Sequence, residues 1–436
     1  MPLRLHTSDS AFEQAFVDFL QTKREGEVDV TQDVVRIIED VRARGDAAVL
    51  HYAERYDGQK LTADSLRISN EEIVEAAAAA PARAKDALTI AARRIEDFHR
   101  QQLPADLQFE DSDGIGLGYR WTPIASVGLY VPGGSAAYPS TVLMTALPAQ
   151  AAGVDRIAMV VSTREGQLHP MVAAAAELAG VVEIYRVGGA HAIAALALGT
   201  ESILAVDKIA GPGNAYVTAA KRQMFGTVGI DMIAGPSEIL VVADADNDPA
   251  WIAADLLSQA EHDENAQTIL MTDDAAFADS VEHAISDQLS RLERASIASA
   301  AWQDYGAVII LETLEGAPSL IDRIAPEHLE LAVSQPEELA KEVRNAGAIF
   351  LGRYTPEAVG DYIAGPSHVL PTARSARFSS GLSVLDFMKR TSLVRCNAQS
   401  LQAVGPAAVV IADSEGFGAH ALSLKIRLND DGNSET

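Results

Sequence analysis

The chain has 436 residues, too many for one small hydrophobic core, so we expect two or more domains. Its composition, with 48% hydrophobic and 22% charged residues, is typical of a globular protein. The formal net charge of −27 would repel phosphate groups, which argues against nucleic acid or an anionic membrane surface as a partner.

The chain contains a single cysteine, Cys396, which excludes an intrachain disulfide and a cysteine-based metal cluster. Arg395 supplies a nearby cation but no other catalytic signature surrounds this thiol, so we interpret Cys396 as structural. The first residues lack the apolar core of a signal peptide, and no apolar run is long enough to cross a membrane. We therefore expect a cytoplasmic protein without a membrane partner.

The first hundred residues are dominated by helical patterns. Apolar residues recur at helical spacing over residues 11–20, 30–56 and 70–100. Ser69 and the acidic residues after it are a typical helix start. No pattern in this part indicates chemistry, and we interpret it as scaffold or as a dimer surface.

A glycine-rich loop at 132–141 follows a predicted strand at 126–131 and precedes a predicted helix at 142–151. Backbone N–H groups of such a loop and the positive end of the helix can hold an anion. A tight structural turn is the alternative interpretation, because glycine-rich turns are common. The alternating glycines of 114–118 lack the G-x-G-x-x-G spacing, and we interpret them as part of a β-turn region.

Strands and helices then alternate in two similar units, on either side of a break at 232–238. Strands are predicted at 155–162, 181–187, 206–209 and 228–230, and after the break at 238–243, 268–272, 307–311, 329–333 and 348–351. This alternation predicts parallel α/β domains, whose ligands are expected at the carboxyl ends of the strands. Beyond 354 we expect a loop at 360–368, helices at 385–391, 398–404 and 407–415, and a strand at 422–428.

Gln259 and His262 lie near the end of the helix predicted for 249–262. Residues three apart project from one face of a helix. An imidazole and an amide oxygen that converge are half of a metal site or half of a hydrogen-bonded polar pair, and a solvated helix end is the third interpretation.

Several stretches together resemble the histidinol dehydrogenase family. They are residues 131–140, 210–214, 229–238, 258–263, 325–330 and 381–384. The resemblance extends from about residue 10 to 428 and implies an α/β fold with two similar, incomplete Rossmann-like parallel-sheet domains, small N-terminal helical and C-terminal segments, and a homodimer with intertwined domains.

The resemblance also implies domain boundaries. Residues 1–24 would form an N-terminal segment that packs with 104–128. Residues 25–103 and 237–381 would form the first α/β domain, with the metal and the catalytic residues. The second α/β domain, 129–236, would contact NAD, and the segment 382–436 would be exchanged in the dimer.

Members of the family oxidise L-histidinol to L-histidine through the aldehyde, with two NAD and one zinc ion per site. By motif, the implied zinc ligands are Gln259, His262, Asp361 and His420, and the implied catalytic pair is Glu327 and His328. The implied substrate contacts are Ser237, Gln259, His262, His328, Asp361, Glu415 and His420. The implied NAD contacts are Tyr130, His191 and Asn214, where His191 replaces a glutamine that is usual in the family.

These residue types suit the implied chemistry. Two imidazoles, a carboxylate and an amide oxygen form a nitrogen and oxygen set that suits Zn²⁺. His328, with a reference pKa of about 6.5, can take the proton of the hydroxyl, and Glu327 can activate the water that adds to the aldehyde. Glu415 can pair with the ammonium or imidazolium of the substrate. Since Cys396 has no catalytic setting, a route through water fits better than a thiohemiacetal.

The dimer of the family would place Glu415 and His420 in the site of the partner, because the segment after 381 has too little apolar mass to fold alone. Two other functions stay open. A paralogue oxidising another amino alcohol or a sulfonated diol is one, although Glu415 would repel a sulfonate. A catalytically silent NAD- or metal-binding protein is the other, and the complete set of polar residues argues against it.

Overall fold

The computed structural model describes residues 2–22, 30–133, 137–163 and 166–428. The chain divides into two compact units. The first comprises Met1–Gln102 and Ala125–Phe387, and the second comprises Leu103–Ile124 and Met388–Thr436. Within the described ranges, no helix has the length and apolar character needed to cross a membrane.

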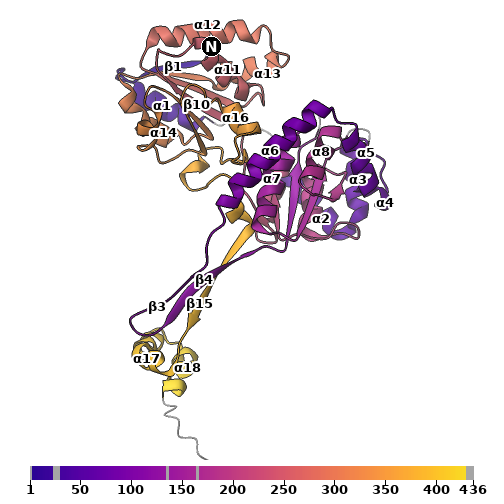
Figure 1. Cartoon of the computed structure of the whole chain (residues 1–436), viewed down its shortest axis with the longest axis vertical. Coiled ribbons are helices and arrows are strands. Elements are labelled where there is room, and N and C mark those ends of the chain that lie inside the picture. Colours follow the sequence, from indigo (N-terminus) through magenta and orange to yellow (C-terminus); the bar gives the residue numbers. More distant parts are fainter. Residues whose placement is uncertain (1, 23–29, 134–136, 164–165, 429–436) are drawn as a thin grey trace, which may run out of the picture. The chain divides into compact units, whose positions relative to one another are not determined.

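Two six-stranded sheets form the framework of the first unit (Figure 1). In sheet order, the first consists of β1 (Leu3–His6), β12 (Ala307–Ile310), β11 (Gln267–Thr272), β10 (Glu238–Ala243), β13 (His328–Ala332) and β14 (Ala348–Leu351). The second consists of β2 (Arg67–Ile68), β7 (Glu183–Tyr185), β6 (Arg156–Val161), β5 (Ser126–Val131), β8 (Lys208–Ala210) and β9 (Gly229–Ile230). All neighbouring strands are parallel except β2 on β7.

The last five strands of each sheet, counted along the chain, follow the same order. If β10 to β14 and β5 to β9 are each numbered one to five, both sheets run 3-2-1-4-5. This is the Rossmann order without its sixth strand. The prediction of an α/β fold with two incomplete Rossmann-like sheets is therefore confirmed.

Helices cover both faces of the first sheet, which is why its central strands are apolar throughout. Every residue of β10 is buried, and its side chains alternate between two cores. Ile239 and Val241 face the helices on one side, and Leu240 and Val242 face those on the other. The first layer contains α11 (Pro249–Ala260), α12 (Ala275–Leu289) and α13 (Ala295–Tyr305), and the second contains α1 (Phe12–Gln21) and α14 (Ala317–Ile324).

The N-terminal segment belongs to this first sheet. Strand β1 pairs with β12, and Phe16 and Phe19 of α1 are buried against the sheet with Leu240. Two large aromatic side chains gain free energy by entering this core. Most of the segment 104–128, with which residues 1–24 were expected to pack, belongs to the second unit, and that packing stays a prediction.

The helices of residues 31–101 pack around the second sheet, not the first. They are α2 (Thr31–Arg44), α3 (Asp46–Asp57), α4 (Ala63–Leu66), α5 (Asn70–Ala78) and α6 (Ala82–Gln101). The other helices of this sheet are α7 (Pro139–Ala152), α8 (Pro170–Leu178), α9 (Gly189–Leu198) and α10 (Ala215–Met224). Placing 25–103 with 237–381 is thus corrected: Val34, Ile37 and Val41 of α2 share a core with Tyr130 and α9. Gly45, at φ +53°, separates α2 from α3, where one helix was predicted.

Short elements follow the strands of the first sheet. They are a 3₁₀ turn at Leu314–Gly316, α15 (Pro336–Ala340), α16 (Glu357–Tyr362), and 3₁₀ turns at Ser375–Arg377 and Val384–Phe387. Helix α16 contacts both α11 and β13. It therefore brings residues from beyond the last strand back to the body of the sheet.

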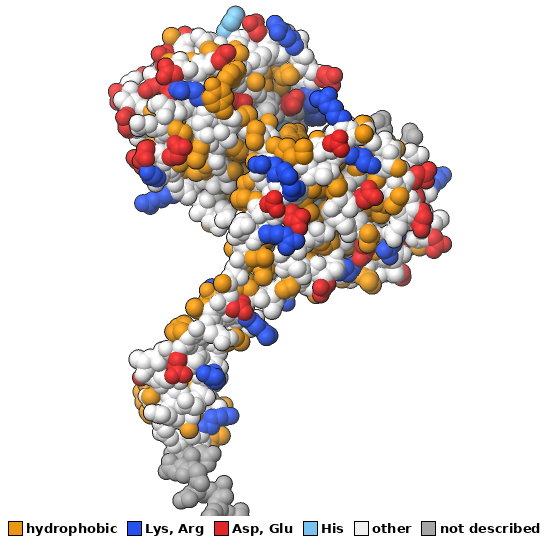
Figure 2. Space-filling view, viewed as in Figure 1, with side chains coloured by type: hydrophobic (Ala, Val, Ile, Leu, Met, Phe, Trp, Pro, Cys, Tyr) orange, Lys and Arg blue, Asp and Glu red, His pale blue; other side chains and the backbone are white. Residues whose placement is uncertain are grey.

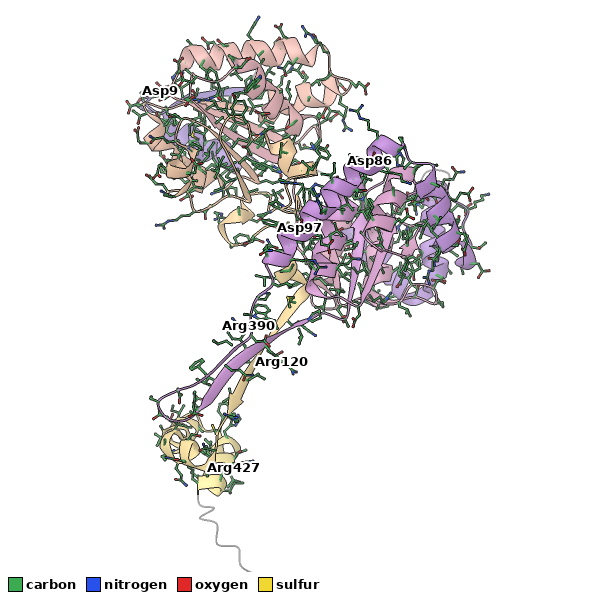
Figure 3. All side chains as sticks on the ribbon, in the orientation of Figure 1. Asp9, Asp86, Asp97, Arg120, Arg390 and Arg427 are labelled. Atoms are coloured by element: carbon green, nitrogen blue, oxygen red, sulfur yellow. The ribbon has the colours of Figure 1, made fainter. Side chains whose placement is uncertain are left out.

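The second unit is a three-stranded antiparallel sheet with two helices. The strands are β15 (Met388–Arg395), β4 (Gly116–Pro123) and β3 (Leu107–Glu110), and the helices are α17 (Ala398–Ser414) and α18 (Gly418–Leu428). Figure 3 labels Arg120 and Arg390, which lie on the neighbouring strands β4 and β15. The guanidinium of Arg390 lies 5.3 Å from the ring centre of Tyr119.

Two predicted elements of this unit are corrected. The helix predicted at 385–391 is mostly strand, because β15 pairs with β4 along its whole length. The strand predicted at 422–428 lies in α18, where Leu428 packs so closely on Gly405 of α17 that a side chain there would overlap it. Contacts between residues so far apart in the chain are invisible to local patterns.

Candidate functional site

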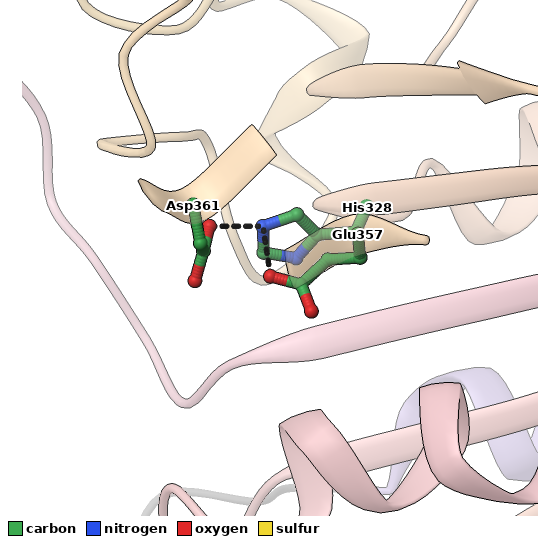
Figure 4. A group of neighbouring side chains, drawn as sticks. All are labelled: His328, Glu357 and Asp361. Atoms are coloured by element: carbon green, nitrogen blue, oxygen red, sulfur yellow. Dashed lines mark ion pairs between the residues drawn. The ribbon is translucent and has the colours of Figure 1, made fainter. Parts of the chain in front are cut away.

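A polar cluster lies between β13 and α16 (Figure 4). His328 begins β13, and Glu357 and Asp361 lie one turn apart on α16. The Nε2 atom of His328 is 3.6 Å from Asp361 Oδ1 and 3.9 Å from Glu357 Oε1. Asp361 was expected in a loop, and the structure places it on a short helix, whose spacing directs both carboxylates towards the imidazole.

A backbone contact fixes the orientation of His328. Its Nδ1 atom lies 2.9 Å from the carbonyl oxygen of Glu238, which can only accept a hydrogen bond. Nδ1 therefore carries a proton, and a neutral ring presents its lone pair at Nε2. The side chain is buried, and Nε2 has no hydrogen-bond partner among the described residues. Nε2 is the atom that can accept a proton.

Glu327 is held at the amino ends of β10 and β13. Its Oε2 atom accepts the backbone N–H of Glu238 at 2.8 Å, and a carboxylate oxygen of Glu238 accepts the N–H of Glu327 at 3.3 Å. Its Oε2 also lies 3.7 Å from His328 Nδ1. Glu327 and His328 are therefore rigidly placed as neighbours. Ser237, another expected substrate contact, directly precedes β10 at the same end of the sheet.

Gln259 and His262 lie at the end of α11. The helix ends at Ala260, so His262 lies in the following turn. The backbone N–H of His262 donates a hydrogen bond to the Gln259 carbonyl at 3.1 Å. Gln259 is buried, and its side-chain amide favours the ionised form of the Glu357 carboxyl group, which acts to lower the pKa of Glu357. His262 and Asp361 line one cavity of about 550 Å³. The structure therefore brings three of the four predicted zinc ligands to one place.

His368 also lines this cavity, and sequence reasoning did not select it. Its Nδ1 lies 3.0 Å from the Asp361 carbonyl oxygen, and its Nε2 lies 3.3 Å from the hydroxyl of Thr141 on α7. The carbonyl requires an N–H donor, so the Thr141 hydroxyl donates to Nε2 of a neutral ring. His368 thus connects α16 with the helix after the glycine-rich loop of the second sheet.

The charges of the cluster shift its pKa values strongly. Burial by itself lowers the pKa of His328, but the charges of Glu327, Asp361 and Glu357 outweigh it and raise the pKa to about 9. Burial, then the Asp361 charge, raises the pKa of Glu357 to about 7. Burial acts to raise the pKa of Asp361, yet His328 and His368 hold it below its usual range. The expected pKa of His328, close to 6.5, therefore does not hold for this charge environment.

The residues present suit a divalent metal ion. His328, Glu357 and Asp361 offer ligand atoms within 4.8 Å of one another. Two of the buried atoms of this group, His328 Nε2 and Glu357 Oε1, lack hydrogen-bond partners among the described residues. With Gln259 and His262 adjacent, the donors are nitrogen and oxygen atoms, which zinc accepts.

A larger cavity of about 1370 Å³ lies at the second sheet, and it brings together all three residues expected to contact NAD. Tyr130 is the residue before the last one of β5, and its hydroxyl accepts a hydrogen bond from the N–H of Gly189 at 3.0 Å. Asn214 caps α10, with its side-chain oxygen accepting the N–H of Val217 at 3.1 Å. The glycine-rich loop expected to hold an anion lies in part outside the described residues, at 134–136.

His191 lies in the first turn of α9 and is buried beside aromatic side chains. Its ring centre is 5.7 Å from that of Tyr52 and 6.4 Å from that of Tyr56. Burial lowers its pKa to about 3, so the ring is neutral. Its Nε2 has no hydrogen-bond partner among the described residues.

The other two expected site residues lie in the second unit. Glu415 follows α17 directly, and His420 lies on α18 with its ring centre 5.3 Å from that of Phe417. Both side chains are exposed. Lys425 and Asp413, 2.9 Å apart, join the two helices around them.

Sequence reasoning missed Glu357 and His368. The signal for Glu357 was its distance of four residues from Asp361 after Pro356, which is typical of a helix start. His368 follows Gly365-Pro366-Ser367 and carries no local signal for its long-range contacts. The expected NAD contacts of the second sheet lie at the carboxyl ends of strands, as ligands of such sheets usually do, whereas Glu327 and His328 lie at the amino end of β13 in the first sheet.

Comparisons with known proteins agree with this arrangement. The family model of histidinol dehydrogenase matches residues 20–428. The chain is 62% identical over 430 residues to the histidinol dehydrogenase of Rhodospirillum rubrum, with 98% of this chain and 99% of that protein covered. It is 60% identical over 429 residues to that of Rhizobium meliloti, with the same coverage.

A solved structure supports the same assignment. The crystal structure of histidinol dehydrogenase from Elizabethkingia anophelis superposes with a TM-score of 0.93 at 36% identity, over 98% of each chain. The Rossmann-like sheets and the polar site are thus those of an oxidoreductase. More particularly, the chain belongs to the histidinol dehydrogenase family, whose activity serves histidine biosynthesis.

Proposed function

We propose that this chain oxidises L-histidinol through L-histidinaldehyde to L-histidine, with NAD as the hydride acceptor of both steps. The observation that carries the proposal is the buried pair Glu327 and His328 beside a cluster able to bind a metal. The cavity at this cluster and the larger cavity of the second sheet share the lining residue Ala137. A substrate at the cluster and a dinucleotide in the larger cavity can therefore meet.

The proposed zinc ligands are Gln259, His262 and Asp361 of one chain and His420 of a second copy. These residues would hold a zinc ion, which the amine and imidazole of histidinol would chelate, so that the reacting carbon of the substrate is held in place. Ser237, His328 and Glu415 complete the proposed substrate contacts, and Tyr130, His191 and Asn214 are the proposed NAD contacts. Buried atoms without hydrogen-bond partners at His328 and Glu357 support a cation at this place.

His328 is the proposed base of the first step. Its Nε2 takes the hydroxyl proton while a hydride leaves the same carbon for NAD, which gives the aldehyde. This role needs a neutral ring, whereas the surrounding carboxylates hold the pKa of His328 at about 9. A divalent cation at Asp361 would offset that negative charge and lower the pKa towards neutrality.

Glu327 is the proposed base of the second step. Its carboxylate takes a proton from the water that adds to the aldehyde, and the hydrate then gives its second hydride to a second NAD. The hydrogen bond from the Glu238 N–H fixes the orientation of the Glu327 carboxyl group. Each step removes two electrons, so one histidinol reduces two NAD.

A homodimer is proposed to supply Glu415 and His420. The second unit exposes many large apolar side chains, and Figure 2 draws such side chains among the charged ones on the visible face. Those more than half exposed there are Phe109, Val394, Val410, Ile411, Phe417, Leu422 and Ile426. Exposed apolar surface of this kind is typical of a protein interface. A variant that is monomeric yet retains zinc and full activity would contradict this part.

The assay for the function follows NADH with purified protein, zinc, NAD and L-histidinol. Two NADH for each histidinol would support the proposal, and no turnover would refute it. The alternative is a paralogous zinc- and NAD-dependent dehydrogenase of another amino alcohol or of a sulfonated diol. Turnover of such a compound at a higher kcat/KM than histidinol would favour that alternative, which Glu415 disfavours because an acid repels a sulfonate.

A further inference from the structure

The cavity of the second sheet has an acidic residue in its lining. Among the described residues that line it, Asp57 is the acidic one, and none is a lysine or an arginine. Asp57 is the last residue of α3, and Gly58, at φ +66°, ends the helix directly after it. The helical N-terminal part of the chain, which showed no chemistry in its sequence, therefore supplies a charged group to this cavity.

The carboxylate of Asp57 lacks partners. It forms no hydrogen bond or ion pair with the described residues, and although Asp57 is exposed, partial desolvation beside the cavity wall raises the pKa of its carboxyl group. Its charge also acts on the phenol of Tyr130, one of the proposed NAD contacts. A carboxylate at the wall of a cavity with open acceptor sites is suited to hydroxyl donors from a ligand.

The position of the two cavities sets the direction of a bound dinucleotide. The nicotinamide must reach the substrate beside His328, and Ala137 lines both the cavity of His262 and Asp361 and the larger one. The adenosine half then extends away from Ala137 into the larger cavity. Asp57 and Tyr56 line that cavity together with Tyr130 and His191.

We propose that Asp57 accepts hydrogen bonds from the 2′- and 3′-hydroxyls of the adenosine ribose and thereby selects NAD over NADP. The inference rests on the proposed use of NAD. A 2′-phosphate would remove one donor and set a dianion against the carboxylate, and the juxtaposition of like charges is unfavourable. The guanidinium of Arg55, 5.3 Å from the ring centre of Tyr56, is not among the lining groups.

The test measures dissociation constants of NADH and NADPH by ligand fluorescence, without histidinol. Wild-type protein should bind NADPH about a hundredfold more weakly than NADH. Asp57→Asn should weaken NADH about tenfold and reduce the discrimination to less than about tenfold. Asp57→Glu keeps the charge and should retain the preference. Asp64→Asn, at an exposed acid of α4 outside the cavity lining, is the matched control and should change nothing.

Three results would overturn the proposal. They are equal binding of NADH and NADPH by wild-type protein, an unchanged ratio in Asp57→Asn, and an equal change in Asp64→Asn. Urea unfolding of each variant separates a lost contact from a lost fold. Because binding is measured without substrate, absence of histidinol turnover would refute the proposed function and leave this inference standing.

Discussion

The two parallel sheets of the first unit have the same strand order but carry their polar residues at opposite ends. In the second sheet, the expected NAD contacts Tyr130, His191 and Asn214 lie at or beyond the carboxyl ends of strands. In the first sheet, Glu327 and His328 open β13 at its amino end. One topology thus provides two different kinds of site.

The difference lies in how each end is built. At the second sheet, glycines let backbones approach closely, and a side chain at Gly133 or Gly188 would overlap Ser162. At the first sheet, the amino ends of β10 and β13 are joined through the carboxylates of Glu238 and Glu327. The carboxyl end of the second sheet therefore offers backbone groups and space for a long ligand. The amino end of the first sheet offers fixed charges for chemistry.

Removal of the proposed metal ion should have the largest effect, because it should abolish the reaction at the first sheet and leave NADH binding at the second sheet unchanged. A chelator should abolish histidinol oxidation, and added zinc should restore it. Because the proposed NAD contacts lie on another sheet, the dissociation constant of NADH should change by less than about twofold. Metal content, NADH fluorescence and turnover are measured on the same sample. Full activity in a sample free of metal would show that the cluster does not use one.

Glu327→Gln tests the division of labour inside the catalytic end. The amide can still accept the Glu238 N–H, so the fold should be preserved. Without a base for water, oxidation of histidinaldehyde should slow by about a hundredfold or more, and oxidation of histidinol by less. Rapid-mixing assays that start from each substrate give both rates. Equal losses in the two steps would refute the assignment, and Glu342→Gln, at an exposed site, is the control.

Much of this comparison was predictable from the sequence, for identifiable reasons. The strands of both sheets are continuous apolar runs between turn residues, and Asn214 and the glycine pair before His191 lie where such runs end. His328 and Asp361 of the cluster were found through the family resemblance, because Asp361 lies about a hundred positions from His262 in the chain. No local pattern connects them.

Other features depend on contacts that a linear pattern does not contain. Strand β1 is short, and only its pairing with β12 makes it a strand. The pKa of His328 depends on three carboxylates, of which Glu357 was not anticipated. Helix α3 lies beside the second sheet because the apolar face of α2 packs there. The sequence of that face does not indicate which of the two sheets it covers. Tertiary contacts decided each of these points.

Lys221→Met tests the support of the NAD end. The ammonium of Lys221 pairs with Asp231, and both side chains are almost completely buried. Lys221 also donates to the Gly211 carbonyl at 3.1 Å, and Asp231 accepts the Gly211 N–H at 2.7 Å. Leaving Asp231 without its partner should lower the free energy of unfolding by about 3–5 kcal/mol, measured in urea. Lys341→Met, at an exposed pair, should cost less than about 1 kcal/mol.

The smallest expected effect is a pH dependence from His191. Burial holds its pKa at about 3 in the folded chain, whereas the unfolded value is about 6.5. The unfolded chain therefore binds a proton below pH 6.5 that the folded chain refuses, and stability falls as the pH falls from 6.5 towards 3. By pH 5 the loss should reach about 2 kcal/mol.

His191→Gln should remove that loss, because an amide does not titrate. Urea unfolding at pH 7 and pH 5 gives the difference between wild type and variant, and exposed His283→Gln is the control. An identical pH dependence in wild type and His191→Gln would show that the imidazole becomes protonated inside the fold. The same variant introduces the glutamine that the family resemblance implies at this position, so its affinity for NADH shows whether His191 weakens or merely replaces an amide contact. If His191→Gln bound NADH more tightly than the wild-type protein, the buried, neutral ring of His191 would be the weaker contact.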